Sequence, residues 1–99
     1  MNYSLIVRRE AEQDLRDAYE WYEERRAGIG DDFLLCVDAA VESILDGPLH
    51  YPALHENIRR VLVRRFPYGV FYIVDGVTVV ILAVMHCSRD PRAWEGRTA

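Results

Sequence analysis

The sequence predicts an α+β domain with the order β-α-α-β-β-β, in which a helical hairpin packs on a small antiparallel sheet. Three observations support this. Residues 10–46 hold two amphipathic stretches separated by a segment with Gly28 and Gly30. Residues 59–85 hold three strand-like runs in succession. The length of 99 residues is close to that of one domain, so we expect residues 1–99 to form a single domain.

The N-terminal half begins with a strand-like run at residues 3–7 and continues into the two helices. The first helix is expected from residue 10 to about residue 26, because apolar residues recur there at intervals of three and four. The second helix is expected to be capped by Asp31 or Asp32 and to stop at Gly47. Two such helices joined by a short loop form an antiparallel hairpin.

Three consecutive strands are expected at residues 59–66, 70–74 and 77–85, where β-branched and aromatic residues are frequent. Asp75 and Gly76 form a dipeptide that tolerates positive φ at both central positions of a tight turn. The second and third of these strands are therefore predicted to form a β-hairpin.

The segments beside the strands carry weaker signals. Residues 48–57 contain two prolines and no periodicity, so we expect a loop or a short helical turn. His50 and His55 lie in this segment without the spacing of metal ligands, so we expect no metal and no other cofactor. Asp90 is a suitable N-cap for a short terminal helical turn at residues 90–94.

Both faces of the predicted sheet are apolar, which is unusual for a two-layer α+β domain. Strict alternation in the last strand gives two sets of residues: Val77, Val79, Ile81, Ala83 and Met85 on one face, and Thr78, Val80, Leu82 and Val84 on the other. The helical hairpin can cover only one face. The other has to be covered by the C-terminal tail, by a second copy or by a different protein.

The charge is unevenly distributed along the chain. All twelve basic residues are arginines, and each can make a bidentate contact with a carboxylate or phosphate. Residues 1–58 hold five Arg and thirteen Asp or Glu, a net charge of −8, whereas residues 59–99 hold seven Arg and three Asp or Glu, a net charge of +4. This asymmetry indicates a charged partner for one half.

The sequence also argues against a membrane-spanning or a secreted protein. No apolar run reaches the roughly 18 residues that a transmembrane helix needs, and the N-terminus lacks the pattern of a signal peptide. We therefore expect a cytoplasmic protein that does not enter a membrane. Cys36 and Cys87 are far apart and lack metal spacing, so we expect buried thiols and no disulfide.

Four polar residues are candidates for a functional site near the ends of the last strands: Arg64, Arg65, His86 and Arg89. Neighbouring strand residues point to opposite faces, so only one of the first two arginines is expected to serve a given cleft. A histidine with one or two arginines can cleave an RNA phosphodiester, the histidine transferring a proton and arginine stabilising the phosphate charge. Alternatively, these residues are ordinary surface side chains that are solvated or paired with carboxylates.

An aromatic cluster occupies the second half of the first helix. Tyr19 and Tyr22 fit the apolar stripe, whereas Trp21 lies beside it. These residues either pack within the domain or anchor a partner peptide. The acidic helices argue against contact with nucleic acid.

Taken together, these motifs resemble toxins of the RelE/ParE superfamily of bacterial type II toxin–antitoxin systems. The resemblance covers nearly the whole chain. Its most specific parts are the Arg-Phe-Pro-Tyr block at residues 65–68 and the closing block with His86, Arg89-Asp90-Pro91 and Trp94. Earlier parts are residues 10–15, Trp21-Tyr22-Glu23, Gly28-Ile29-Gly30 with Phe33-Leu34, and the loop with Pro48 and Pro52.

The resemblance implies a small cognate antitoxin that wraps the helices and the sheet and forms a hetero-oligomer with the toxin. Operator DNA is then contacted only through the antitoxin. Candidate antitoxin-binding residues are apolar or aromatic: Leu15, Tyr19, Trp21, Tyr22, Phe71 and Ile73. The antitoxin implied by the resemblance is a partner that can cover the second apolar face.

The target follows from the branch of the superfamily. ParE-like toxins inhibit DNA gyrase by binding, whereas RelE-like toxins cleave mRNA on the ribosome. The acidic net charge of −4 and the absence of lysine favour the ParE-like branch. The target-binding candidates are Arg65, Arg89, Arg92 and Trp94; for a nuclease, the catalytic candidates are Arg65, His86 and Arg89. A relative that only binds its antitoxin is a third alternative.

Overall fold

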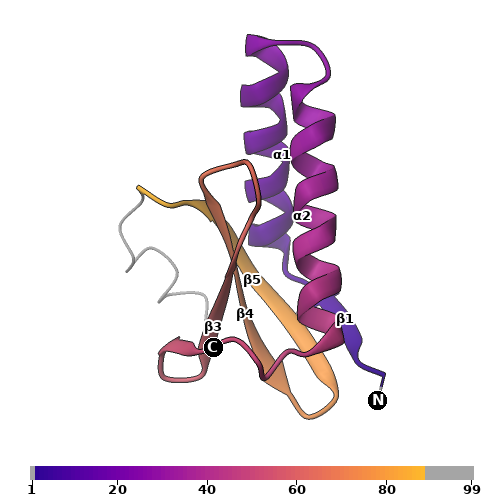
Figure 1. Ribbon diagram of the computed structural model, residues 1–99, viewed down its shortest axis with the longest axis vertical. Helices are drawn as coiled ribbons and strands as arrows, with labels where there is room; N and C mark the ends of the chain where they lie inside the picture. Colours follow the sequence, from indigo (N-terminus) through magenta and orange to yellow (C-terminus); the bar gives the residue numbers. More distant parts are fainter. Residues whose placement is uncertain (1, 89–99) are drawn as a thin grey trace.

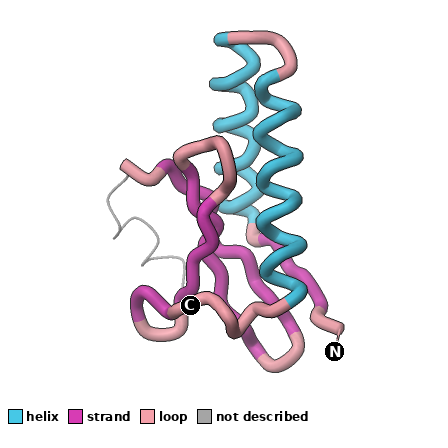
Figure 2. The backbone as a smooth tube through the Cα atoms, in the orientation of Figure 1, coloured by secondary structure: helices cyan, strands magenta, loops and turns pink. Residues whose placement is uncertain are grey.

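The computed structural model describes residues 2–88, and these form two helices packed on one face of a five-stranded sheet (Figures 1 and 2). The elements in chain order are β1 (Ser4–Val7), α1 (Arg9–Arg25), α2 (Ile29–Asp46), β2 (Ala53–His55), β3 (Ile58–Leu62), β4 (Tyr68–Asp75) and β5 (Thr78–His86). The strand order is β1-β5-β4-β3-β2. The α+β class and the helical hairpin predicted from the sequence are confirmed.

The pairing of the first strand differs from the prediction. β1 pairs parallel with β5, from Ser4 opposite Thr78 to Val7 opposite Ile81, so the sheet is mixed. The two strands are far apart in sequence, and no tight turn between them imposes an antiparallel direction. The β5–β4 and β4–β3 pairs are antiparallel as expected. The β3–β2 pair, which the sequence did not predict, is also antiparallel.

A second difference is the short strand β2, which lies in the segment predicted as a loop. It pairs with β3 through Ala53 opposite Arg59 and His55 opposite Ile58. Glu56, in the turn between the strands, has a φ of 51°. Glutamate rarely adopts this left-handed conformation, so the sequence carries no turn signal there.

The helices lie close to their predicted positions, except at the start of α2. α1 ends at Arg25, whereas α2 already begins at Ile29, with Gly28 as its N-cap at a φ of 93°. Asp31 and Asp32 therefore lie in the first turn and do not cap the helix. The early start is possible because Gly28 adopts the left-handed conformation without steric cost.

A side chain of α1 caps α2 in place of an aspartate. Glu23 Oε1 accepts hydrogen bonds from the backbone N–H groups of Gly28 at 2.9 Å and Gly30 at 2.8 Å. A Cβ atom added at Gly30 would lie 2.6 Å from Glu23 Cγ and 2.7 Å from Tyr19 Cδ2. Gly30 thus allows the two helices to approach closely at the end of the hairpin, which extends beyond the sheet (Figure 1).

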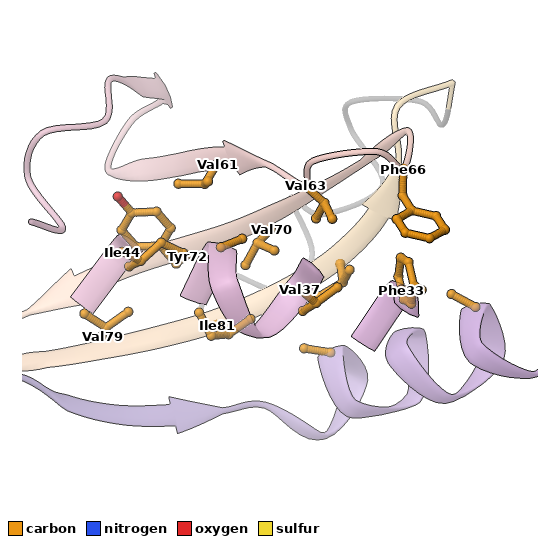
Figure 3. Close-up of a cluster of buried hydrophobic side chains, with 14 residues drawn as sticks. Phe33, Val37, Ile44, Val61, Val63, Phe66, Val70, Tyr72, Val79 and Ile81 are labelled. Atoms are coloured by element: carbon orange, nitrogen blue, oxygen red, sulfur yellow. The ribbon is translucent and has the colours of Figure 1, made fainter. Parts of the chain in front are cut away.

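The main core fills the space between the hairpin and the sheet (Figure 3). Phe33 of α2 packs edge-on against Phe66 and Tyr68, with ring centroids 5.3 Å and 4.9 Å apart. Tyr72 of β4 is fully buried, and its hydroxyl donates to the carbonyl of Pro48 at 2.5 Å. The loop after α2 is thereby fixed to the centre of the sheet.

A β-bulge in β5 breaks the alternation expected from the sequence. Phe71 pairs with Ala83, but Tyr72 pairs with Ile81, so Leu82 is the extra residue. Beyond this bulge Val84 belongs to the main core, whereas Met85 belongs to a second cluster. The assignment of residues 83–85 to faces by strict alternation was therefore wrong, because one inserted residue shifts the register by one.

The second cluster confirms that both faces of the sheet are apolar. Its buried members are Ile58, Phe71, Leu82, Ala83 and Met85, with Ile73 and Val80 packed beside them. Phe71 retains only 8% of its surface exposed, so this side chain is not an open contact surface. Ile73 and Val80 are half-buried.

The remaining sequence expectations concern the cysteines and the membrane. Cys36 is half-buried and Cys87 is exposed, and no disulfide joins them. The exposure of Cys87 differs from the burial expected, because it follows the last residue of β5 at the end of the sheet. Within residues 2–88, neither helix combines the length and apolar character needed to cross a membrane.

Candidate functional site: an arginine-lined groove and the end of the sheet at His86

The turn between β3 and β4 carries the first pair of candidate residues. Val63 and Phe66 are buried, with 5% and 9% of their surfaces exposed, and the N–H of Val63 donates to the carbonyl of Tyr68 at 2.8 Å. These contacts hold the turn against the core. Arg64 and Arg65 lie between them and are exposed.

Arg65 has a backbone conformation that is unusual for arginine. Its φ is 72°, in the left-handed region. β3 ends at Leu62, so the two arginines are not neighbours on a strand, and the prediction that they point to opposite faces was wrong. Both line the same groove.

This groove lies between α2 and β3 and has a volume of about 800 Å³. Its walls are apolar, with a basic component supplied by three arginines. The lining residues are Leu35, Cys36, Ala39, Ala40, Ser43, Tyr51, Arg60, Val61, Leu62, Arg64 and Arg65. The sequence analysis did not find this groove, because its two sides come from segments about 25 residues apart whose apolar outer positions look like ordinary surface residues.

Arg65 makes only weak contacts within the domain. Its guanidinium lies 3.9 Å from the carboxylate of Asp32, and the two side chains are 64% and 47% exposed. Exposed ion pairs contribute little to stability, because solvent screens the attraction. The guanidinium also lies 5.7 Å from the ring of Phe66. Arg65 can therefore exchange these contacts for those of a partner.

His86, the candidate proton-transfer group, is at the end of β5. It pairs with Tyr68 of β4, and the two rings pack edge to face at 5.2 Å. His86 Nδ1 accepts the backbone N–H of Ser88 at 3.0 Å and lies 2.8 Å from Ser88 Oγ. Because Nδ1 accepts a hydrogen bond, the proton of the neutral imidazole resides on Nε2.

Tyr68 is the aromatic partner of His86 and is set in a less polar environment. Burial raises the pKa of the Tyr68 hydroxyl, and the nearby Tyr22 and Asp14 raise it further. Tyr68 is therefore a neutral hydroxyl near neutral pH. The turn that holds Arg65 leads directly into Tyr68, which pairs with His86, so Arg65 and His86 belong to the same end of the sheet.

Asp14 is a residue that the sequence analysis missed. Its Oδ2 accepts the backbone N–H of Val84 at 3.0 Å, which joins α1 to β5 just beyond the bulge. The two residues are 70 positions apart, and nothing in the local pattern around Asp14 indicates this contact. The bond fixes the strand end that carries His86.

The aromatic residues of α1 divide between the core and the surface. Tyr22 packs against Phe33 and Phe66, with ring centroids 5.4 Å and 5.0 Å apart. Trp21 is 49% exposed, and the guanidinium carbon of Arg25 lies 3.4 Å from the centre of its ring. Tyr22 is therefore mainly structural, whereas Trp21 can contact a partner.

The other predicted antitoxin-binding residues are less exposed than Trp21. Leu15 and Tyr19 are half-buried on α1, and Leu15 packs against the main core. The neighbouring charges of Asp31 and Glu23 raise the pKa of Tyr19. Phe71 and Ile73 belong to the second cluster on the other side of the sheet, so the structure does not bring the six residues together on one surface.

Some candidates are not placed. Arg89, Arg92 and Trp94, together with the helical turn predicted at residues 90–94, lie outside the described residues. Among residues 2–88, no group of three or more His, Cys, Asp or Glu is arranged to hold a metal ion. His55 Nε2 lies 3.7 Å from the carboxylate of Glu56.

The family is decided by the match of residues 5–91 to the model of the ParE toxin of the type II toxin–antitoxin system parDE. The chain belongs to the ParE toxin family. It is also similar to Toxin ParE2 of Mycobacterium tuberculosis, with 32% identity over 103 residues that span 99% of this chain and 98% of that protein. The superfamily indicated by the sequence is thus confirmed, and the chain is the toxin component of a type II toxin–antitoxin system.

Solved structures of related systems share the fold of this ParE-family toxin. The chromosomal ParDE system of Pseudomonas aeruginosa matches with a TM-score of 0.76 and 19% identity, over 85% of this chain and 95% of that chain. A mutant of the Escherichia coli toxin RelE in the free state gives 0.63 and 16%, over 89% and 86%. The M. tuberculosis toxin–antitoxin complex RelBE2 gives 0.59 and 24%, over 87% and 99%.

Proposed function

We propose that this ParE-family toxin acts in the cytoplasm by binding DNA gyrase and that it cleaves no bond. The proposal extends the family membership of the chain by naming a target and a mechanism. The observation that carries it is the hydrogen bonding of His86, the residue best suited to proton transfer among the candidates.

The hydrogen bonding of His86 favours the tautomer that carries the proton at Nε2, so Nε2 has no free lone pair with which to act as a general base. Because Nδ1 accepts the N–H of Ser88, the neutral ring holds its proton at Nε2. A general base needs a free lone pair within reach of the substrate proton. The Nδ1 lone pair is occupied by the backbone of the chain itself, which supports a binding role for this surface.

The charge distribution supports a protein target. The basic excess of +4 is confined to residues 59–99, and residues 1–58 carry −8. Such a dipolar surface can orient the toxin on a charged patch of a protein. An RNA groove is anionic throughout and repels the acidic half. In the proposal Arg65 contacts gyrase together with Arg89, Arg92 and Trp94.

The proposed antitoxin surface includes the exposed side of the hairpin. Trp21 is the exposed aromatic residue among the candidates, and Leu15, Tyr19 and Tyr22 lie along the same helix. On the sheet, Ile73 is more accessible than Phe71. The antitoxin would connect the toxin to operator DNA, because the acidic helices do not suit direct contact with DNA.

The second candidate function is cleavage of mRNA on the ribosome, as in the RelE branch. The observation that favours it is the approach of Arg65 and His86 to one end of the sheet, which would allow them to share a substrate. In that case His86 transfers the proton and Arg65 stabilises the phosphate charge.

The two functions are separated by two variants tested in parallel. The purified protein, His86→Ala and a deletion of residues 89–99 are added to a gyrase supercoiling assay and to a translating-ribosome mRNA cleavage assay. We expect His86→Ala to keep inhibiting gyrase and to remain toxic in cells. We expect the deletion to abolish both effects while the antitoxin still binds, which controls for folding. Cleaved mRNA with the wild type, lost in an inactive His86→Ala, would establish the endonuclease instead.

A further inference from the structure

We propose that residues 89–99 pack across the face of the sheet opposite the helices and cover the second cluster, with Trp94 as the anchor. The buried members of this cluster are Ile58, Phe71, Leu82, Ala83 and Met85, and Ile73 and Val80 pack beside them. The bearing of this arrangement on the target rests on the proposed function, because Arg89 and Arg92 belong to the same segment.

The first support is that no described element accounts for the burial of the second cluster. Ile58, Leu82 and Ala83 have 0% of their surfaces exposed, and Met85 has 3%. Every member of the cluster comes from β3, β4 or β5, whereas both helices pack on the opposite face (Figure 1). Side chains stand roughly perpendicular to a sheet, so neighbours on the same face leave their ends open. Complete burial therefore calls for a further layer, and apart from Met1 only residues 89–99 lie outside the described part of the chain.

The second support is the gradient of burial along this face. The second cluster is buried near the end of β5, where Ser88 leads into residues 89–99. Val80 and Ile73, nearer the other end of the face, are only half-buried. Ile6 of β1 pairs with Val80 and is 52% exposed. A cover of limited length that starts at Ser88 produces this gradient. A second copy is not needed, because the burial is present within one molecule.

The third support is the length and the composition of the segment. Trp94 follows Ser88 by six residues, which span up to about 20 Å when the chain is extended. Leu82 precedes Ser88 by six residues within β5, and a strand rises about 3.3 Å per residue, so this distance is also about 20 Å. Trp94 can therefore return to the level of Leu82. A tryptophan buries about 150–250 Å² of surface, which suits it to anchor a short segment on an apolar face.

The consequence for the target is that two arginines are held close to the end of the sheet. Arg89 follows shortly after His86, the last residue of β5. With Trp94 anchored on the sheet, the part of the chain that includes Arg92 is fixed at both ends. A segment that is fixed before binding loses less conformational entropy in the complex. Trp94 then contributes to target binding mainly through the arginines that it positions.

The experiment measures by NMR how strongly a soluble nitroxide broadens single methyl signals, in the full chain and in a deletion of residues 89–99. Ile58 in the second cluster and Ile44 in the main core are a matched pair, because both are isoleucines with 0% exposure. Met85 is a further probe, and the chain has only one other methionine, Met1. We expect the deletion to increase the broadening of Ile58 and Met85 at least about fivefold, because their apolar surface loses its cover. The broadening of Ile44 is expected to stay within about twofold, because the main core is kept.

A single substitution tests the anchor. Trp94→Ala is expected to increase the broadening of Ile58 and Met85 as the deletion does. Trp21→Ala, which removes an exposed tryptophan from α1, is the control and is expected to leave both methyl groups protected. Protection of Ile58 and Met85 that survives the deletion would overturn the proposed cover. Equal broadening of Ile44 would overturn it as well, because the segment would then support the whole domain and not one face.

The effect on the target is measured separately in the gyrase supercoiling assay. We expect Trp94→Ala to inhibit gyrase at least about tenfold less well than the wild type, because the arginines lose their fixed position. Trp21→Ala is expected to inhibit within about twofold of the wild type. A Trp94→Ala that inhibits as well as the wild type would overturn the positioning role. A wild-type toxin without effect on gyrase would overturn the proposed function but not the cover, because the methyl measurements do not involve gyrase.

Discussion

At the scale of single residues, two polar side chains fix the loop that follows α2. The hydroxyl of Tyr72 donates to the carbonyl of Pro48, and Arg59 Nη1 donates to the carbonyls of Leu49 and Tyr51. A buried carbonyl without a partner costs about 1–3 kcal/mol. These contacts therefore hold the loop against the sheet and position Tyr51 at the groove.

Replacement of Tyr72 by phenylalanine is expected to reduce the free energy of unfolding by about 1–2 kcal/mol, because it removes only the hydroxyl and leaves the carbonyl of Pro48 unpaired. Urea unfolding measures this change. Tyr3→Phe, at a half-buried position near the start of the chain, is the control and is expected to change stability by less than about 0.5 kcal/mol. Equal stability of Tyr72→Phe and the wild type would contradict the role given to the hydroxyl.

The stability of Tyr72→Phe is also expected to depend less on pH than that of the wild type at high pH. Burial raises the pKa of Tyr72 from 10.0 to about 12. The folded state therefore resists ionisation of this group, and its contribution to stability is complete below pH 10 and is lost as the pH rises through 12. Tyr72→Phe lacks this ionisation, so its stability is expected to fall less than that of the wild type across this interval.

At the scale of elements, the hairpin depends on a cap that comes from its other helix. The carboxylate of Glu23 satisfies two N–H groups at the start of α2 and lies at the positive end of the helix dipole. Phe33, in the same first turns of α2, packs against Phe66 in the turn that carries Arg65. The position of the candidate site therefore depends on the packing of the hairpin.

Glu23→Ala is expected to lower the free energy of unfolding by about 1–2 kcal/mol, because two N–H groups lose their partner. Glu23→Gln retains an acceptor oxygen but not the charge, so we expect a smaller loss. Glu24→Ala removes a neighbouring, exposed carboxylate and serves as the control. Thermal unfolding of the three variants, monitored by circular dichroism, tests this order, and a Glu24→Ala as unstable as Glu23→Ala would contradict it.

The elements also show how far the sequence could predict the fold. Apolar periodicity placed α1 within a residue of its observed ends. Asp75-Gly76 marked the turn between β4 and β5, but Asp75 is the last residue of β4 and pairs with Thr78, so the central turn residues are Gly76, with a φ of 60°, and Val77. The bulge at Leu82 and the left-handed Arg65 have no local signal, because the tertiary contacts around them impose both conformations. The groove was missed for the same reason: neither wall is distinctive until α2 and β3 are brought together.

At the scale of the whole molecule, the charge asymmetry connects the fold to the choice of target. The acidic residues are concentrated on the segment that forms the hairpin, and the basic residues on the segment that forms the last strands. Since the hairpin covers one face of the sheet (Figure 2), the acidic and the basic segments are close together in space. A partner has to match a basic groove while avoiding the acidic helices.

The dependence of target binding on salt distinguishes a protein partner from a nucleic acid. Contacts from three exposed arginines to carboxylates are screened by salt, with a Debye length of about 10 Å at 0.1 M. Binding to purified gyrase in the absence of DNA, measured by surface plasmon resonance, is therefore expected to weaken by about tenfold or less between roughly 50 and 200 mM salt. Arg64→Glu is expected to reduce this sensitivity to salt, whereas Arg16→Glu is not.

Contact with six to ten phosphates would weaken binding by about 10³-fold or more over the same interval, because each contact releases counterions. Binding to ribosomes or RNA with such a steep dependence, together with weak binding to gyrase, would contradict the gyrase assignment and favour the endonuclease.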